Sequence, residues 1–435
     1  MDKKVLVISH NCFSKNSNIG RTLASYFCNY NPNNLAQLYF HDETPNSSVC
    51  LNYYNFTDTD ALKSIFARWR KGKVFNKGNI DLDRKDSRNY SSSTARIYEY
   101  GRKRKPFVSY LRDLMWRLSS WNNRHFKKWL YNFGPDLILL TASDYSFPYV
   151  IANKIKKMTK IPMIIVCYDD FFLNYQHQGE FFRNIFYRHF LKCANKAIKT
   201  SSATFANNPK MSKDYENFFG REWPVLYMSA DYIATSISYD ISKRKGICYL
   251  GNLGYNRNLQ LVEIGKYLKN NKLGFLPKHI DVYSNEKNKE TIGVLNEENG
   301  IVFHGSIAKD EVQKIVNNSI AVLHVESFDD KNRNLVKYSF STKIADCLGS
   351  GTPLIAFGPG DIASIEYLID NDCAFIAENN DELESVFNCL LEKNVVNKVL
   401  YNALTIARRN HNRECITSGL YNVLNSIVGK YGDTN

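Results

Sequence analysis

The sequence lacks any run of about twenty consecutive apolar residues, the length that a membrane-spanning helix needs. Its first apolar run, residues 5–8, is also too short for the apolar core of a secretory signal peptide. The low hydrophobicity of disordered chains is missing too, because 44% of the residues are hydrophobic. We therefore expect a folded, soluble, cytoplasmic protein. Such a protein can still lie peripherally on the inner face of the cell membrane.

Cysteine pairs with the C-x-x-C spacing of zinc and redox sites are absent as well. The ten cysteines are scattered from Cys12 to Cys415, and most of them lie within apolar segments. They are typical of buried free thiols in a reducing compartment. The formal net charge is +14, but no zinc-finger, RNP or helix-turn-helix pattern accompanies it. Nucleic acid is therefore not an expected partner.

The length of 435 residues is too great for one ordinary core and suits two domains of about 200 residues each. Short apolar strands alternate with helical patterns along the chain, which is typical of α/β folds with parallel sheets. We predict two Rossmann-like domains, residues 1–235 and 245–400. Helices over residues 401–435 are expected to cross back and pack on the first domain. The polar stretch from Asp231 to Lys245 is the expected hinge.

The predicted strands form two sets. The first set covers residues 5–8, 36–40, 137–141, 163–168, 204–206 and 225–228. The second set covers residues 247–250, 280–283, 301–303, 321–325, 354–357 and 374–376. Open parallel sheets bind ligands beyond the carboxyl ends of their strands. We therefore expect the chemistry on the loops that follow the strands, in a cleft between the two domains.

Positive charge is concentrated in one segment of the first domain. Residues 68–128 contain eighteen Lys or Arg and five Asp or Glu, so they carry +13 of the net +14. Four of the five tryptophans belong to the same region: Trp69, Trp116, Trp121 and Trp129. We predict a basic insertion over residues 68–130. Its first part, residues 70–105, is polar, which predicts a long loop.

The second part of the insertion, residues 107–130, predicts an amphipathic helix. Its apolar residues recur at helical spacing: Phe107, Leu111, Leu114, Leu118 and Trp121. A basic amphipathic helix with tryptophan at its boundary suits an anionic membrane surface. A helix that packs its apolar face on the core gives the same pattern, and both interpretations stay open. Residues 181–192, which mix aromatic and basic side chains, are a candidate for the same surface.

Two loops after predicted strands have the residues of a phosphate site. The loop after the first strand reaches Gly20 just before a helical pattern, where glycine permits close backbone approach and a helix N-terminus attracts anions. The second domain opens with Gly251 and Gly254 around a tight turn, and Arg257 precedes a helix. An arginine there can hold a diphosphate with two hydrogen bonds, although tight turns and surface arginines are the ordinary alternatives.

The stretch from residue 339 to residue 368 is the richest in candidates. Ser341 and Thr342 precede a helix, where their hydroxyls can cap it or hold phosphate oxygens. Lys343 lies in its first turn, against the helix dipole, so a bound anion would explain its place. Asp346, one turn further on, can accept hydrogen bonds from ribose hydroxyls. Gly358 opens a turn into another helix, whose free amides would face the ligand.

These motifs resemble those of the nucleotide-sugar glycosyltransferases with the two-domain GT-B fold, particularly the family-four-like group. The resemblance covers nearly the whole chain and is strongest over residues 247–376. In the family the second domain opens with Gly-Arg-Leu, then three residues, then a lysine that binds the diphosphate. Here Arg257 stands where that lysine stands, and Asn252 replaces the arginine. The run from Ser341 to Lys343 is similar to a phosphate-binding variant of capsule and lipopolysaccharide transferases.

The family also carries two glutamates separated by seven residues. Asp346 falls on the second of them, which contacts ribose in the family. Tyr338 falls on the first, which faces the sugar, so that position has lost its carboxylate. Glu326, at the end of the preceding predicted strand, is the candidate to supply one instead.

In the first domain the family often has a histidine or an acid after a middle strand, close to the sugar. Here Asp169 and Asp170 follow the predicted strand 163–168, and the resemblance makes one of them the candidate catalytic acid or base. Asp144, after the strand at 137–141, is a second candidate, with helix capping as its alternative role.

The resemblance implies transfer of a sugar from a nucleotide donor, with UDP favoured, to a lipid-linked glycan acceptor in surface polysaccharide synthesis. It also implies retention of the anomeric configuration, while an inverting route with Asp169 or Asp170 as base stays open. The D-x-D runs at residues 58–60 and 81–83 lie away from strand ends. Arg257, Lys343 and a helix N-terminus can stabilise the leaving diphosphate, so we expect neither a metal nor a cofactor.

Two other functions are compatible with these residues. A nucleotide-sugar 2-epimerase has the same two-domain architecture, but it needs no lipid acceptor and leaves the basic insertion unexplained. A catalytically inactive sugar-binding module is the third possibility, since Asn252 and Tyr338 depart from the family pattern.

Overall fold

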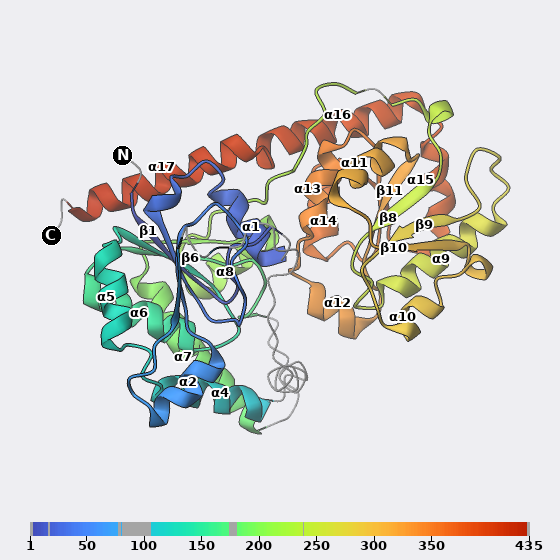
Figure 1. The fold of residues 1–435 in the computed structure, drawn as a ribbon. Helices are drawn as coiled ribbons and strands as arrows, with labels where there is room; N and C mark the ends of the chain where they lie inside the picture. Colours follow the sequence, from blue (N-terminus) through green and yellow to red (C-terminus); the bar gives the residue numbers. More distant parts are fainter. Residues whose placement is uncertain are drawn as a thin grey trace. The chain divides into compact units, whose positions relative to one another are not determined.

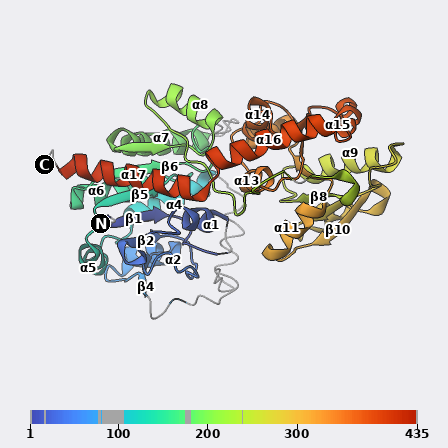
Figure 2. The same cartoon turned by 90° about the horizontal axis from the view of Figure 1, so that it is seen from above.

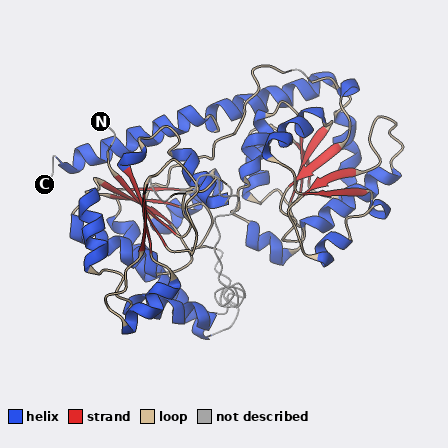
Figure 3. Ribbon diagram, viewed as in Figure 1, coloured by secondary structure: helices blue, strands red, loops and turns tan. Residues whose placement is uncertain are grey.

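The computed structural model describes residues 3–15, 18–76, 80, 106–173, 181–237 and 239–432. Its contacts divide the chain into two compact units, which are described separately (Figure 1). Unit 1 comprises Met1–Asn207, Ser212–Leu226 and Thr417–Asn435, and unit 2 comprises Asn208–Met211 and Tyr227–Ile416. Each unit has a central sheet with helices packed around it (Figure 3).

The sheet of unit 1 has the strand order β4-β3-β2-β1-β5-β6-β7. All neighbours pair in parallel except β3 and β4, which are antiparallel at the edge. The order reverses between β1 and β5, as in doubly wound α/β folds. The strands are β1 (Val5–Ser9), β2 (Leu35–Tyr39), β3 (Asn52–Asn55), β4 (Lys73–Asn76), β5 (Leu137–Thr141), β6 (Met163–Val166) and β7 (Ala203–Phe205).

The helices of unit 1 include two, α4 and α5, that come from the basic insertion. Asp113 of α4 accepts hydrogen bonds from the Ser146 and Phe147 amides, so one helix of the insertion caps the N-terminus of α6. The helices are α1 (Asn18–Tyr26), α2 (Asp58–Phe66), α4 (Pro106–Leu118), α5 (Arg124–Phe133), α6 (Phe147–Thr159), α7 (Phe181–Thr200), α8 (Pro209–Phe219) and η1 (Pro32–Asn34), with α8 beginning in the short Asn208–Met211 segment of unit 2.

The sheet of unit 2 is entirely parallel, with the order β10-β9-β8-β11-β12-β13. Apolar clusters cover both faces, so these strands are mostly apolar, with Asp281, His304 and His324 as their polar residues. The strands are β8 (Ile247–Leu250), β9 (Ile280–Tyr283), β10 (Ile301–Gly305), β11 (Ala321–Val325), β12 (Leu354–Phe357) and β13 (Phe375–Ala377). The helices are α9 (Arg257–Asn270), α10 (Lys289–Gly293), α11 (Lys309–Asn318), α12 (Asp330–Val336), α13 (Thr342–Gly349), α14 (Ala363–Asp370), α15 (Leu383–Cys389) and α16 (Lys393–Asn410), with η2 (Ile241–Lys243), η3 (Glu297–Asn299) and η4 (Asn380–Glu382).

The last helix, α17 (Arg413–Gly432), starts in unit 2 and continues in unit 1 from Thr417. Its unit 1 part buries Thr417, Leu420 and Leu424, and the ring of Tyr421 meets that of Tyr30 edge-on at 4.9 Å. Figure 2 shows this part of α17 lying along unit 1. A C-terminal helix that crosses back to the first domain is thus present.

The predicted α/β fold with two Rossmann-like domains is confirmed, and its strands are shifted by at most a few residues. One predicted strand is wrong, because Val225 forms only an isolated bridge to Ala206 within residues 225–228. Strands β3 and β4 were not predicted. Strand β4 lies inside the expected loop 70–105, most of which falls outside the described residues.

The predicted helix over residues 107–130 is in fact two helices. Asn123 accepts a hydrogen bond from the Phe126 amide and caps a new helix, α5, which ends the first one early. Three tryptophans of this region, Trp116, Trp121 and Trp129, are buried, while Trp69 is exposed. In the stretch 181–192, Phe186 and Phe190 are buried too. None of the helices among the described residues has the length and apolarity to span a bilayer.

Candidate nucleotide-binding site

The point where the strand order reverses in unit 2 lies between β8 and β11. Both strands are parallel, so their carboxyl ends lie at the same edge of the sheet. Ligands of doubly wound sheets bind at this place, because the loops on its two sides lead to opposite faces of the sheet. Glu326 directly follows β11, and the loop after β8 leads to Arg257 at the start of α9.

Arg257 and Glu326 form a two-pronged ion pair across this point. The Nε of Arg257 donates to Oε2 of Glu326 at 3.0 Å, and Nη2 donates to Oε1 at 2.8 Å. The two side chains are only 14% and 2% exposed. Burial raises the pKa of the Glu326 carboxyl, and the Arg257 guanidinium opposes that rise. Although burial disfavours its charge, Arg257 has a raised pKa beside Glu326, so the cation is held in one place.

The loop between β8 and α9 has an unusual backbone. Tyr255 and Asn256 are consecutive non-glycine residues with left-handed φ angles of 61° and 59°. Each such residue costs on the order of 1 kcal/mol or more, and strain of this kind gathers at ligand sites. Asn256 is also the N-cap of α9 and makes no side-chain capping bond. The helix therefore presents an N-terminus without a side-chain cap next to Arg257.

Two contacts hold this strained loop. Gly251 lies so close to Tyr249 that an added Cβ would be 2.3 Å from the tyrosine ring, while the Tyr249 hydroxyl donates to the Asn252 carbonyl at 2.7 Å. At the other end Asn256 Nδ2 donates to Asp329 Oδ2 at 3.0 Å. Partial burial would raise the pKa of Asp329, but hydrogen bonds from Ser327, Asn332 and Asn256 lower it to about 2. An ionised carboxylate thus fixes the end of the loop.

His324 is a buried histidine two residues before Glu326 on β11. Its Nε2 lies 2.9 Å from the hydroxyl of Ser364 in α14. Burial, then the charges of Arg257 and Lys343, lower the pKa of His324 to about 3, so the imidazole is neutral. Arg257 and Lys343 are therefore the two cations whose charges act on this ring.

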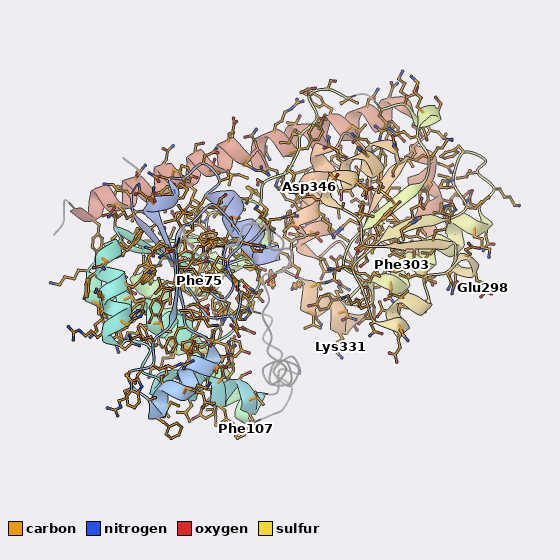
Figure 4. The ribbon with its side chains drawn as sticks, viewed as in Figure 1. Phe75, Phe107, Glu298, Phe303, Lys331 and Asp346 are labelled. Carbon is orange, nitrogen blue, oxygen red and sulfur yellow. The ribbon has the colours of Figure 1, made fainter. Side chains whose placement is uncertain are left out.

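Helix α13 holds the remaining predicted residues of unit 2. Ser341 is its N-cap and accepts from the Lys343 amide at 3.4 Å, and Thr342 is its first residue. Asp346, marked on α13 in Figure 4, uses Oδ1 to accept the Asp231 amide at 2.7 Å. One oxygen of Asp346 therefore anchors the segment that leads into unit 2. Ser341 acts as the helix cap that the sequence allowed, and Lys343 follows in the first turn of α13.

Gly358 permits close packing at the end of β12. A Cβ at this position would lie 2.8 Å from Ile365 Cδ1 and 3.0 Å from both Cβ and the carbonyl oxygen of Glu326. No side chain fits there without moving the residue that holds Arg257. The glycine therefore supports the site by packing.

We expect Gly358→Ala to lower the free energy of unfolding by about 1–3 kcal/mol, the usual cost of overpacking. Gly293→Ala is the matched control, because a Cβ at Gly293 in α10 has no atom within 4 Å. Thermal melts of both variants test this. Equal melting temperatures for the two would contradict it.

The predicted residues of unit 1 lie at the ends of its central strands. Gly20 packs the first turn of α1 onto the loop after β1, where a Cβ would be 2.4 Å from the Cys12 carbonyl oxygen. Asp170 accepts from the Phe172 and Leu173 amides and from the Tyr215 hydroxyl, at 3.0, 3.0 and 2.7 Å. Its neighbour Asp169 is exposed. Of the two aspartates, Asp169 is the one that can reach a solvent-borne substrate.

A histidine in unit 1 was missed by the sequence reasoning. His10 follows β1 at the strand-order reversal, and both of its ring nitrogens are shielded from solvent and lack a hydrogen-bond partner among the described residues. Aromatic rings surround it, with Phe147 at 5.5 Å and Tyr145 at 5.8 Å between centroids. Burial, followed by the charges of Arg112 and His41, lowers its pKa well below the ordinary value. The sequence feature that could have indicated His10 is its position just after the first predicted strand.

The D-x-D runs have other roles where the structure describes them. Asp58 accepts from Trp116 Nε1 at 2.7 Å and from Arg112 Nε at 3.0 Å, and Asp60 completes the capping box of α2 with Thr57. Asp81 and Asp83 lie outside the described residues. Within the described part of the chain, no three acidic, histidine or cysteine side chains come together in a way that would hold a metal ion.

Comparison with known proteins gives structural neighbours only. No family model matches the sequence, and no curated protein matches it significantly. A sucrose-phosphate synthase from Thermosynechococcus elongatus superimposes with a TM-score of 0.60 over 98% of this chain and 100% of its own, at 9% identity. The chain has the GT-B fold. Anabaena HepE, solved with UDP-glucose, gives a TM-score of 0.59 over 97% and 99% of the two chains, at 13% identity.

A third neighbour with this GT-B fold is WaaG, a glycosyltransferase of lipopolysaccharide biosynthesis. It superimposes with a TM-score of 0.53 over 96% of this chain and 99% of its own, at 10% identity. At identities this low the likeness extends to the architecture alone.

Proposed function

We propose that the protein is a glycosyltransferase that moves a sugar from a nucleotide donor, with UDP favoured, onto a lipid-linked glycan acceptor. It would act in surface polysaccharide synthesis at the inner face of the cell membrane. The fold supports this proposal, because two neighbours with the same fold are named as a sucrose-phosphate synthase and a glycosyltransferase, and a third, HepE, was solved with UDP-glucose.

The guanidinium of Arg257, fixed beyond the end of β11 by its ion pair with Glu326, carries the proposal, and we assign Lys343 as the second cation. Both cations lower the pKa of the same buried His324, and the uncapped N-terminus of α9 lies beside one of them. Glu326 cancels one of the two charges, and the neutral imidazole adds none. The remaining positive charge and the helix amides suit the diphosphate of a nucleotide sugar.

The hydrogen-bond inventory of Arg257 leaves room for this ligand. A guanidinium has five N–H donors, and Glu326 accepts from Nε and from one hydrogen of Nη2. The other three donors are available to the diphosphate. As the glycosidic bond to the donor breaks, negative charge grows on the leaving diphosphate, and an already fixed guanidinium stabilises it without reorganising. We accordingly propose transfer without a metal ion or cofactor.

The roles of the carboxylates follow from their contacts. Both oxygens of Glu326 are used by Arg257, so we propose that Glu326 positions the guanidinium and does not itself touch the sugar. Asp346 is the proposed ribose contact. We propose Asp169, which is exposed, as the acid or base of unit 1. Retention is the proposed stereochemical course, and NMR of the product anomer decides between it and inversion.

Donor binding provides the direct test of the site. A ligand at a hundred times its Kd stabilises the native state by about 2.7 kcal/mol, so the cognate donor among UDP-, GDP- and dTDP-sugars should raise the melting temperature by several degrees. Lys343→Gln should weaken that donor by about ten- to a hundred-fold, because a charge-assisted bond is lost. Lys272→Gln, at an exposed lysine of unit 2, is the control and should bind normally. Equal affinities in both variants would remove Lys343 from the site.

The same nucleotide sugars distinguish a transferase from an epimerase and from an inactive binding module. An epimerase converts a nucleotide sugar incubated alone, whereas a transferase needs a glycan acceptor and an inactive module only binds. Transfer should continue in excess chelator, and its complete loss would show that a metal is required.

A further inference from the structure

Two exposed apolar stripes run along neighbouring helices of unit 1. On α2 and the turn after it, Leu62, Phe66 and Trp69 are 52%, 85% and 80% exposed. On α4, Phe107, Leu111 and Leu118 are 49%, 45% and 60% exposed. Single exposed apolar residues are ordinary, but aligned rows of large ones mark a contact surface.

The packing of α2 against α4 places both stripes on one surface. Asp58 in the first turn of α2 bonds to Arg112 and Trp116 of α4. Near its other end, Ser64 accepts the Ser120 amide at 3.0 Å. Asp58, Ser64 and Trp116 therefore lie between the two helices, while the stripe residues are exposed to solvent. Figure 1 shows α2 and α4 side by side, and Figure 4 shows Phe107 at the margin of unit 1.

The charges around these stripes have one sign. The described residues 58–76 and 106–133 contain three acids, and all three are used internally: Asp58 by α4, Asp60 by Arg70 and the α2 cap, and Asp113 by the α6 N-terminus. Lys63, Arg68 and Arg117 are exposed and form no ion pair with any described residue. An apolar face rimmed by unopposed cations is complementary to a layer that is apolar inside and anionic at its surface.

We propose that the α2–α4 surface, defined by Leu62, Phe66, Trp69, Phe107, Leu111 and Leu118, docks the protein on an anionic lipid bilayer. The side chains enter the boundary between headgroups and acyl chains, and the cations contact the headgroups. This deepens the proposed function, since a lipid-linked acceptor lies in the same bilayer. It also relocates the contact, because Trp69 is the tryptophan that is exposed, while Trp116, Trp121 and Trp129 are core residues.

Trp69 gives the surface its own reporter. The other four tryptophans of the chain are buried, so a change in emission on adding vesicles comes from Trp69. With the full-length protein and vesicles of phosphatidylcholine plus phosphatidylglycerol, we expect a blue shift and quenching by brominated lipid. Vesicles of phosphatidylcholine alone should give a weaker response, and added salt should reduce it. Trp69→Phe should lose the spectral change while still sedimenting with vesicles.

A triple variant and a matched control complete the test. Leu62→Ser/Phe66→Ser/Trp69→Ser should partition to anionic vesicles about tenfold or more weakly, because the apolar area that would be buried is lost. Leu391→Ser/Tyr401→Ser removes comparably exposed apolar residues of unit 2 and should bind like the parent. Circular dichroism and melting temperature confirm that each variant is folded. Failure of the parent to bind anionic vesicles, or equal binding by both variants, would overturn the proposal.

Two further measurements test bilayer docking separately from the proposed transferase function. Sedimentation velocity without lipid shows whether the surface joins two copies of the chain; a dimer that the triple variant abolishes, without vesicle binding, would overturn bilayer docking. Transfer to a short, water-soluble acceptor does not need the membrane. The triple variant should retain that transfer, whereas an absence of transfer in the parent would reject the transferase and leave the vesicle result standing.

Discussion

Replacing Arg257 with glutamine should lower kcat/KM for sugar transfer about a hundred- to a thousand-fold. The leaving diphosphate would lose a fixed guanidinium, and the loss of one aimed donor to a developing anion costs about 3–4 kcal/mol in barrier height. Steady-state kinetics with the cognate donor measure this. A variant that keeps more than about a tenth of the parent kcat/KM would contradict the assignment of Arg257 to the diphosphate.

The partner of Arg257 requires a second variant. Arg257→Gln leaves Glu326, which is 2% exposed, without its counter-charge, and breaking a buried pair costs about 3–5 kcal/mol of stability. Arg257→Gln/Glu326→Gln removes both charges and should recover the melting temperature while remaining inactive. If Glu326 acts only by positioning Arg257, adding Glu326→Gln to Arg257→Gln should lower the rate no further. A further large drop would mean that Glu326 itself contacts the sugar.

Acid should destabilise unit 2 through a histidine far along the chain from the site. His411, between α16 and α17, is 0% exposed, and its Nδ1 lies 2.7 Å from the Met228 carbonyl oxygen. That oxygen can only accept, so Nδ1 carries the proton and Nε2 accepts from the Tyr367 hydroxyl at 3.1 Å. Burial lowers the pKa of His411 to about 4. The folded state thus holds a neutral ring that the unfolded chain would protonate.

The direction of this pH dependence follows from linkage. Below the unfolded pKa of about 6.5 the unfolded state binds the proton more readily, so stability falls as the pH decreases from about 6.5 to about 4. The contribution of His411 is complete above that window and amounts to about 3 kcal/mol at most. Urea unfolding at several pH values should show a shallower slope for His411→Asn, which keeps the donor to Met228.

The sequence predicts most of the sheets because buried parallel strands are apolar along their whole length. Strand β12 is an example, with the predicted bounds Leu354–Phe357. Strand β3 is missed because its ends are Asn52 and Asn55, residues that strands disfavour. The helical spacing of the apolar residues predicts the apolar stripe on α4, but it does not show whether the stripe faces the core or the solvent. The helix turns Asp113 and Trp116 inward, because α2 and α6 supply partners that are distant in sequence.

The sequence predicts a candidate site residue only where the local pattern around that residue indicates its role. Arg257 at a helix start and Lys343 against a helix dipole can be recognised singly. The ion pair between Arg257 and Glu326 joins residues 69 positions apart, so no local pattern shows it. The neutral state of His324 is hidden for the same reason, since its lowered pKa depends on burial in the folded chain and on the charges of Arg257 and Lys343.

The two left-handed residues before α9 have a consequence for how a ligand would be received. A loop fixed in advance by Tyr249 and Asp329 loses little conformational entropy when a donor arrives, because that freedom was already surrendered when the chain folded. Binding there should show a small entropic penalty, and glycine in place of Tyr255 or Asn256 should relieve strain yet leave the loop looser. This short loop is therefore rigid before the ligand binds, and the strain that accompanies this rigidity lowers the stability of the native state.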